Sequence, residues 1–175
     1  MKTILSIFIA LMFFQSCSII KNKTITDERT EQKELIGTCT RAGFQKEEFK
    51  MWFDKGYNEY QPKEEIVNKL KAVSLYKGVT IKIIFGTWCG DSKREVPRFF
   101  KLVDKADIPE KIIRLTAVDT KKTSRDKSIE GITFTRIPTF IFYRKGSEIG
   151  RIVESTEKSL EEDMLKILTK LVIRY

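Results

Sequence analysis

The strongest constraint on the fold is a short run of mostly β-branched and apolar residues, from Val79 to Phe85, that leads into a helical pattern. Such a run is typical of a strand inside a sheet. The helical pattern covers residues 92–106, and a second strand is expected over 111–118. Strand, helix and strand in this order predict a right-handed βαβ unit with two parallel strands.

Helical patterns precede this unit. Aromatic residues recur at three- and four-residue steps between 44 and 60, which predicts a helix with one apolar face, interrupted near Gly56. We interpret this aromatic face as core packing. A second helix is expected to begin at Pro62 and to end at Gly78.

The chain after the unit predicts a hairpin and one further helix. Residues 119–131 are polar, with a short helix expected near 124–130. Runs at 139–143 and 148–153 flank a turn and predict a β-hairpin. An amphipathic helix is expected over 159–173.

The 175-residue chain has three cysteines and no histidine, which limits its chemistry. Catalysis by Ser-His-Asp or Cys-His groups is excluded, as is a zinc site that contains histidine. Three cysteines are also too few for a four-thiolate cluster. An enzyme of this composition must use thiol, hydroxyl, amine or carboxylate groups, and we expect neither a metal nor an organic cofactor.

The first 16 residues carry one charge, at Lys2, and contain an apolar run from Ile4 to Phe14. The run is too short to span a bilayer but suits a secretory signal peptide. It ends just before Ser16-Cys17, and this junction resembles a bacterial lipobox, in which the signal is cleaved before a cysteine that then carries a lipid. Ordinary secretion and a short uncleaved anchor are the alternatives.

These features predict three segments. Residues 1–16 are the signal peptide, residues 17–36 are a mostly polar tether, and residues 37–175 are the domain, in which 37–77 is a helical extension. The formal net charge is +9, but the basic residues are scattered. We therefore expect no nucleic-acid partner for this exported protein.

A candidate nucleophile, Cys89, lies where the buried strand meets the helix, in the pentapeptide from Trp88 to Ser92. A cysteine at a helix start faces unpaired N–H groups and the positive end of the helix dipole, which stabilise the thiolate. The two basic residues that follow the pentapeptide add positive charge, whereas Asp91 opposes it. The sequence therefore predicts a reactive thiol.

This pentapeptide resembles the active-site motif of the thioredoxin superfamily, usually WCGPC, with Ser92 in place of the second cysteine. Pro97 matches the proline in the family's active-site helix, and Ile137-Pro138-Thr139 resembles its cis-proline loop. The match is closest to bacterial envelope lipoproteins of thioredoxin type. It implies a thioredoxin-like three-layer α/β fold, a central mixed sheet with helices on both faces, plus the N-terminal helical extension.

The resemblance also implies the roles of the site residues. The catalytic residues would be Cys89, Ser92 and Pro138, and the substrate-binding residues would be Trp88, Gly90, Asp91, Ile137 and Thr139. A cis bond before Pro138 would hold the loop in one tight shape beside the sulfur; an ordinary trans proline at a strand start is the alternative. Trp88 would shield one side of Cys89 or simply pack in the core.

Ser92 changes the mechanism that the family's motif implies. A mixed disulfide can still form at Cys89, but serine cannot release it. Release then needs a thiol of the substrate, a small thiol or Cys39, although we favour Cys39 as a free structural cysteine. Ser92 either caps the helix with Glu95 in a capping box or hydrogen-bonds to the Cys89 thiolate.

Two further positions depart from the family's pattern. Ile83 occupies the place of a buried acid, and Glu154 occupies the place of a glycine. In the family the acid is the proton acceptor near the resolving thiol. Its loss is therefore consistent with the loss of that thiol.

The residues and the resemblance together predict a lipid-anchored envelope protein that exchanges thiols and disulfides through Cys89, with isomerase- or reductase-type chemistry. The expected partners are disulfide- or thiol-bearing envelope proteins and small thiols. Ser18 after Cys17 lacks the aspartate that often marks inner-membrane retention, so we expect the outer membrane, facing the periplasm. The alternative is a redox-inactive binding module that uses the cis-proline groove for extended peptides or a partner protein.

Overall fold

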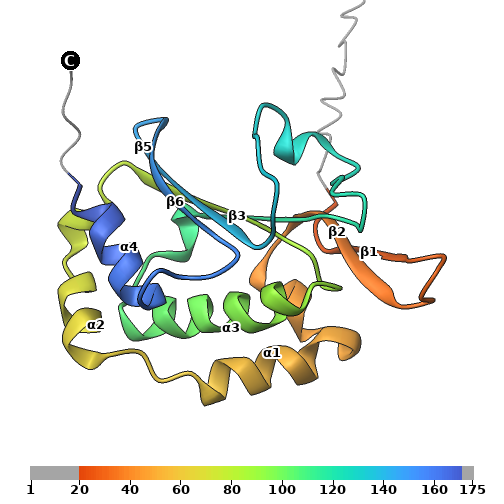
Figure 1. The fold of residues 1–175 in the computed structure, drawn as a ribbon, viewed down its shortest axis with the longest axis horizontal. Coiled ribbons are helices and arrows are strands. Elements are labelled where there is room, and N and C mark those ends of the chain that lie inside the picture. Colours follow the sequence, from red (N-terminus) through yellow and green to blue (C-terminus); the bar gives the residue numbers. More distant parts are fainter. Residues whose placement is uncertain (1–19, 171–175) are drawn as a thin grey trace, which may run out of the picture.

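The computed structural model describes residues 20–170 (Figure 1). The expected signal peptide, Cys17 and residues 171–175 lie outside the described residues. The predictions for those segments therefore stay predictions.

A six-stranded mixed sheet forms the centre of the fold. Its strands, in spatial order, are β1 (Lys23–Thr26), β2 (Lys33–Cys39), β4 (Ile113–Ala117), β3 (Val79–Phe85), β5 (Thr139–Arg144) and β6 (Ser147–Val153). β3 and β4 are parallel, as predicted for the βαβ unit, and the other neighbouring pairs are antiparallel. β3 has a neighbour on each side, so its carboxyl end lies in the middle of the sheet.

The tether expected over residues 17–36 is wrong from Lys23 onward. β1 and the first part of β2 occupy this segment, and Leu35 and Ile36 are buried. The local sequence pattern does not predict β2, because Leu35 and Ile36 are the only aliphatic residues in it that stand side by side. Pairing with β4, in which Cys39 lies opposite Leu115, makes the segment a strand.

The described α-helices are α1 (Glu47–Glu59), α2 (Glu64–Leu70), α3 (Gly90–Lys105) and α4 (Leu160–Leu168). Short 3-10 helices are η1 (Arg41–Gln45), η2 (Val73–Tyr76), η3 (Glu110–Ile112) and η4 (Lys127–Ile129). The helix expected between Pro62 and Gly78 is thus divided into α2 and η2. Between residues 20 and 170, no helix is long and apolar enough to cross a membrane.

Two apolar clusters lie on opposite faces of the sheet, because successive strand residues point to opposite sides. The helices α1, α2, α3 and α4 lie on one side of the sheet (Figure 1), where α1 packs on α3 and α2 on α4. The larger cluster lies on this side and includes Phe53 of the predicted aromatic face. The smaller cluster joins Ile84 and Val118, at the ends of β3 and β4, to Ile137. η4 packs on this second face through Ile129. The predicted mixed sheet with helices on both faces is confirmed.

α1 continues through Gly56, where an interruption was expected. A Cβ at this position would lie 2.7 Å from Cγ of Pro97 in α3. Glycine therefore allows α1 to approach α3 at the point where the proline ring projects.

Replacing Gly56 with alanine should destabilise the fold, although alanine is the better helix former. Helix propensity favours alanine by about 1 kcal/mol, whereas overpacking against Pro97 costs about 1–3 kcal/mol. Urea unfolding should show a free energy of unfolding lower by about 1 kcal/mol for Gly56→Ala. Gly90→Ala is the matched control, because a Cβ there meets no atom within 4 Å. Equal stabilities of the two variants would contradict the close approach.

Candidate functional site

The turn between β3 and α3 is built on a close approach at Gly86. A Cβ on Gly86 would lie 2.6 Å from Trp88 Nε1 and 2.9 Å from Ile137 Cδ1, so only glycine leaves room for both side chains. The Cys89 N–H donates to the Gly86 carbonyl at 3.0 Å, which tightens the turn. The chain then enters α3, with Cys89 as the N-cap residue in an extended backbone conformation.

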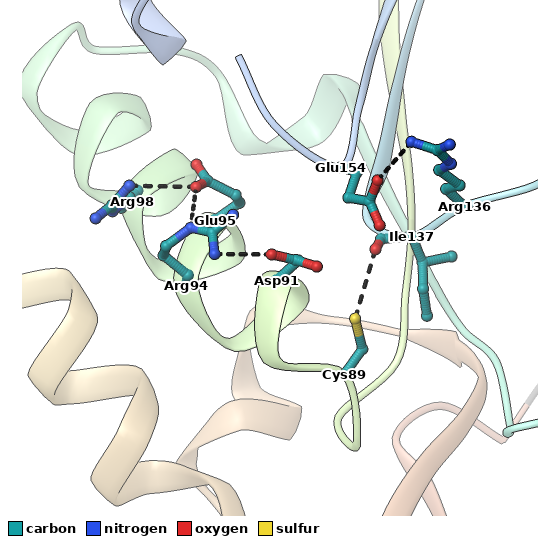
Figure 2. A network of polar contacts seen from close by, with 8 residues as sticks. All are labelled: Cys89, Asp91, Arg94, Glu95, Arg98, Arg136, Ile137 and Glu154. Atoms are coloured by element: carbon teal, nitrogen blue, oxygen red, sulfur yellow. Dashed lines mark hydrogen bonds and ion pairs between the residues drawn. The ribbon is translucent and has the colours of Figure 1, made fainter.

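Cys89 is half-buried, and its thiol donates a long hydrogen bond of 3.5 Å to the Ile137 carbonyl (Figure 2). The Ile137–Pro138 peptide bond is cis. Because the Ile137 carbonyl accepts the hydrogen bond from Cys89, the loop before β5 lies directly beside the sulfur. Cys89 also stands at the N-terminus of α3, where the first backbone N–H groups of a helix have no partner within the helix.

Trp88 connects the turn that carries Cys89 to Val118, the residue just after β4. Its indole N–H donates to the Val118 carbonyl at 2.9 Å. The ring is half-buried against the smaller cluster, and Cys89 packs against that same cluster. Trp88 therefore packs in the core and also lies beside the thiol, so its two interpretations are compatible.

Ser92 supports the turn and does not cap the helix. Because α3 begins at Gly90, Ser92 lies inside the first turn, and the expected capping box with Glu95 is wrong. The serine hydroxyl is fully buried and accepts a hydrogen bond from the Gly86 N–H at 3.3 Å. In the described part of the chain, no hydrogen bond joins this hydroxyl to the Cys89 sulfur.

Ion pairs surround the start of α3 (Figure 2). Asp91 pairs with Arg94 at 2.7 Å. Arg94 and Arg98 also donate to the buried Glu95 carboxylate, at 2.7 and 3.2 Å. These carboxylates partly neutralise the positive charge expected beside Cys89.

Cys39 is a free, buried thiol at the end of β2. It belongs to the larger cluster, and its thiol donates to the Gly37 carbonyl at 3.3 Å. Burial raises the pKa of Cys39 to about 12, so the thiol stays protonated and is a poor nucleophile near neutral pH. Cys89 packs against the other cluster, and these observations together favour a structural role for Cys39.

The cis-proline loop is held by contacts that the sequence does not signal. Thr139 is fully buried and donates to the Arg136 carbonyl at 2.6 Å, so its side chain supports the loop and does not face a substrate, contrary to expectation. Glu154 donates its N–H to the Pro138 carbonyl at 2.7 Å and pairs with Arg136 at 2.9 Å (Figure 2). Its φ of +65° is the left-handed conformation that glycine adopts most readily. The family's pattern, which has a glycine at this position, drew attention to Glu154. No sequence feature indicated the ion pair between Glu154 and Arg136.

The arrangement supports chemistry at one sulfur. Cys89 combines partial exposure with a helix N-terminus, which is the setting of a nucleophilic thiol. Among the described residues, the other thiol is buried in the core, and no group of three His, Cys, Asp or Glu side chains could hold a metal ion.

A family model described as thioredoxin matches residues 43–166. Over 90 residues the chain is 26% identical to a thioredoxin-like protein of Acanthamoeba polyphaga mimivirus, covering 51% of this chain and 63% of that protein, less than two thirds of its length. The solved thioredoxin of Fasciola hepatica is 25% identical, with 59% of this chain and 88% of that chain covered and a TM-score of 0.37. Poplar thioredoxin h is 25% identical, with coverage of 63% and 94% and a TM-score of 0.39. Because the family model spans more than half of the chain, this protein belongs to the thioredoxin family.

Proposed function

We propose that this protein exchanges thiols and disulfides through Cys89 alone. One observation carries the proposal: a half-buried thiol at the N-cap of α3 lies against the Ile137 carbonyl, and a fully buried Ser92 stands where a resolving cysteine would lie. Membership of the thioredoxin family supports thiol-disulfide redox chemistry in general.

The reaction consists of two exchange steps. The Cys89 thiolate attacks one sulfur of a substrate disulfide, a mixed disulfide forms as the substrate S–S bond breaks, and the second substrate sulfur leaves as a thiolate. Another thiolate then attacks the mixed disulfide, and Cys89 leaves as a thiolate. When the substrate supplies that thiolate, the result is isomerisation. When a small thiol supplies it, the small thiol ends in a mixed disulfide with one substrate sulfur.

The surrounding groups control the charge and the position of the sulfur. The dipole of α3 stabilises the Cys89 thiolate both as a nucleophile and as a leaving group. The Ile137 carbonyl accepts the hydrogen bond of the resting thiol. Trp88 offers an apolar surface beside the sulfur for the substrate chain.

Cys89 should be the thiol that reacts in the native protein. In a Cys17→Ala background, the Cys39→Ser variant should react with 5,5′-dithiobis(2-nitrobenzoate) at least about tenfold faster when folded than when unfolded in guanidinium, because α3 stabilises the thiolate only in the folded state. The matched Cys89→Ser variant should react only after unfolding, because Cys39 is buried. The absorbance of the released thiolate measures both rates.

Equal rates in the folded and unfolded states would contradict exchange chemistry at Cys89. The rival function, a redox-inactive binding module, makes a different prediction for complexes isolated from cells. Exchange predicts covalent adducts that depend on Cys89 and that reductants release. A binding module predicts complexes that survive both the reductant and the Cys89→Ser substitution.

We also propose that Cys17 carries a lipid and anchors the protein to the outer membrane, facing the periplasm. The apolar run from Ile4 to Phe14, followed closely by Ser16-Cys17, supports this location. Because β1 begins at Lys23, such an anchor would hold the domain within about 20 Å of the bilayer. Disulfide- or thiol-bearing envelope proteins and small thiols would then be the partners within reach.

Removing the lipidated thiol should release the protein from membranes. The wild-type protein should partition into the detergent phase of Triton X-114, with a mass increased by the lipid, whereas Cys17→Ala should lose the lipid mass and most of this partition. Ser18→Ala is the matched control and should behave like the wild type. An unmodified wild-type mass, or an uncleaved Cys17→Ala protein that partitions like the wild type, would contradict lipid anchoring.

A further inference from the structure

A hollow of about 360 Å³ lies between the β1–β2 hairpin and the segment that follows β4. Glu34 of β2 lines one side, and Asp119, just after β4, lines the other. No sequence motif marks this place, because the residues that form it are separated by more than eighty positions. Figure 1 shows the two chain segments on the same side of the molecule, with β1 and β2 in orange.

Glu34 is the unusual residue of this hollow. Its side chain is only 1% exposed, and its Oε2 atom has no hydrogen-bond partner among the described residues. A buried carboxylate oxygen is strongly unfavourable unless a donor reaches it. Because Glu34 is among the residues that line the hollow, a bound ligand that displaces the side chains covering this oxygen would supply that donor.

The neighbouring acid, Asp119, already has hydrogen-bond donors for its carboxylate. Asp119 accepts hydrogen bonds from the N–H groups of Lys121 and Thr123 and from the Thr123 hydroxyl. It also pairs with Nε of Arg125 at 3.4 Å. This arginine is therefore engaged with Asp119, and Glu34 is the buried acid of the hollow that has an oxygen without a partner within the described chain.

The charge of the site favours a cation with several hydrogen-bond donors. Burial, and then the negative charges of Asp27 and Asp119, raise the pKa of Glu34, and the positive charges of Arg125 and Arg29 only partly oppose this effect. A further positive charge beside this carboxylate would therefore be favourable. A metal is a poor match, because between residues 20 and 170 no three His, Cys, Asp or Glu side chains are grouped to hold one. A guanidinium or ammonium group carries one charge and several donors, which suits a single buried carboxylate.

The hollow is connected to the nucleophile by two hydrogen bonds. The N–H of the residue after Glu34 donates to the Thr87 hydroxyl at 3.1 Å. The carbonyl of the residue before Asp119 accepts the indole N–H of Trp88 at 2.9 Å. The sequence neighbours of Glu34 and Asp119 therefore hydrogen-bond to the two residues that immediately precede Cys89.

We propose that this hollow binds the guanidinium or ammonium group of a basic side chain, with Glu34 as its counter-ion. The occupant is an arginine or lysine of the polypeptide that reacts at Cys89, and this assignment of the occupant rests on the proposed exchange function. The binding of the cation itself does not rest on the exchange function, because it involves no thiol chemistry. Arg29 and Lys121 also line the hollow, so the ligand must compete with these side chains for Glu34.

The probe that tests this proposal is Nα-acetyl-arginine amide, and its citrulline counterpart is the uncharged control of similar shape. The chain has two tryptophans, so two indole N–H signals of ¹⁵N-labelled protein report the titration. The arginine probe should shift the Trp88 signal saturably and leave the Trp52 signal, on α1, unchanged. The citrulline probe should bind at least about tenfold more weakly.

Glu34→Gln removes the charge and keeps the shape, so it should weaken binding of the arginine probe by about tenfold or more. Glu28→Gln, a change at an exposed acid of the same hollow, should have little effect. Equal binding of the two probes, unchanged affinity in Glu34→Gln, or no saturable shift of Trp88 would each overturn the proposal. Repeating the titration with Cys89→Ser separates the two proposals, since cation binding should persist there while exchange is lost.

Discussion

The close packing of Trp88 and Ile137 over Gly86 determines where the Cys89 sulfur lies. A Cβ on this glycine would overlap with both side chains, so their contact depends on its absence. The contact joins three segments: the end of β3, the end of β4 through the Val118 carbonyl, and the cis-proline loop before β5. Because β3 lies in the middle of the sheet, these segments meet where α3 begins, at Cys89.

This arrangement leaves one sulfur in a reactive setting. The hydroxyl of Ser92 accepts a hydrogen bond from the Gly86 N–H, and among residues 20–170 it makes no hydrogen bond to the Cys89 sulfur. Cys39 lies in the larger cluster, where burial holds its pKa far above neutral pH. The proposed exchange cycle at Cys89 would therefore depend on a thiol that arrives with the substrate or from solution.

The elements nearest the site were predictable from the sequence, because each has a strong local pattern. The predicted strand from Val79 to Phe85 is β3 itself, and the helix after it begins only two residues earlier than expected. The hairpin and the position of Cys89 between strand and helix also followed from local patterns. The family pattern singled out Pro138 and Glu154 in addition.

What could not be predicted depends on partners that are distant in the sequence. β2 buries the polar Glu34 and becomes a strand by pairing with β4, so its own sequence resembles a tether. From the sequence alone, Gly56 predicts an interruption of the helix. In the structure it lies inside α1 and allows this helix to approach Pro97 of α3. The capping box fails because the backbone of Cys89, not the Ser92 side chain, sets the start of α3.

The lifetime of a mixed disulfide at Cys89 tests the single-thiol mechanism most directly. A glutathione adduct, made in a Cys17→Ala background and followed by intact mass, should persist after excess reagent is removed and should disappear when free glutathione is added. The Ser92→Cys variant, which supplies a second thiol next to the first, should lose the adduct without added thiol by forming an internal disulfide. Spontaneous loss of the adduct from the protein that retains Ser92, with formation of a Cys39–Cys89 disulfide, would contradict the mechanism.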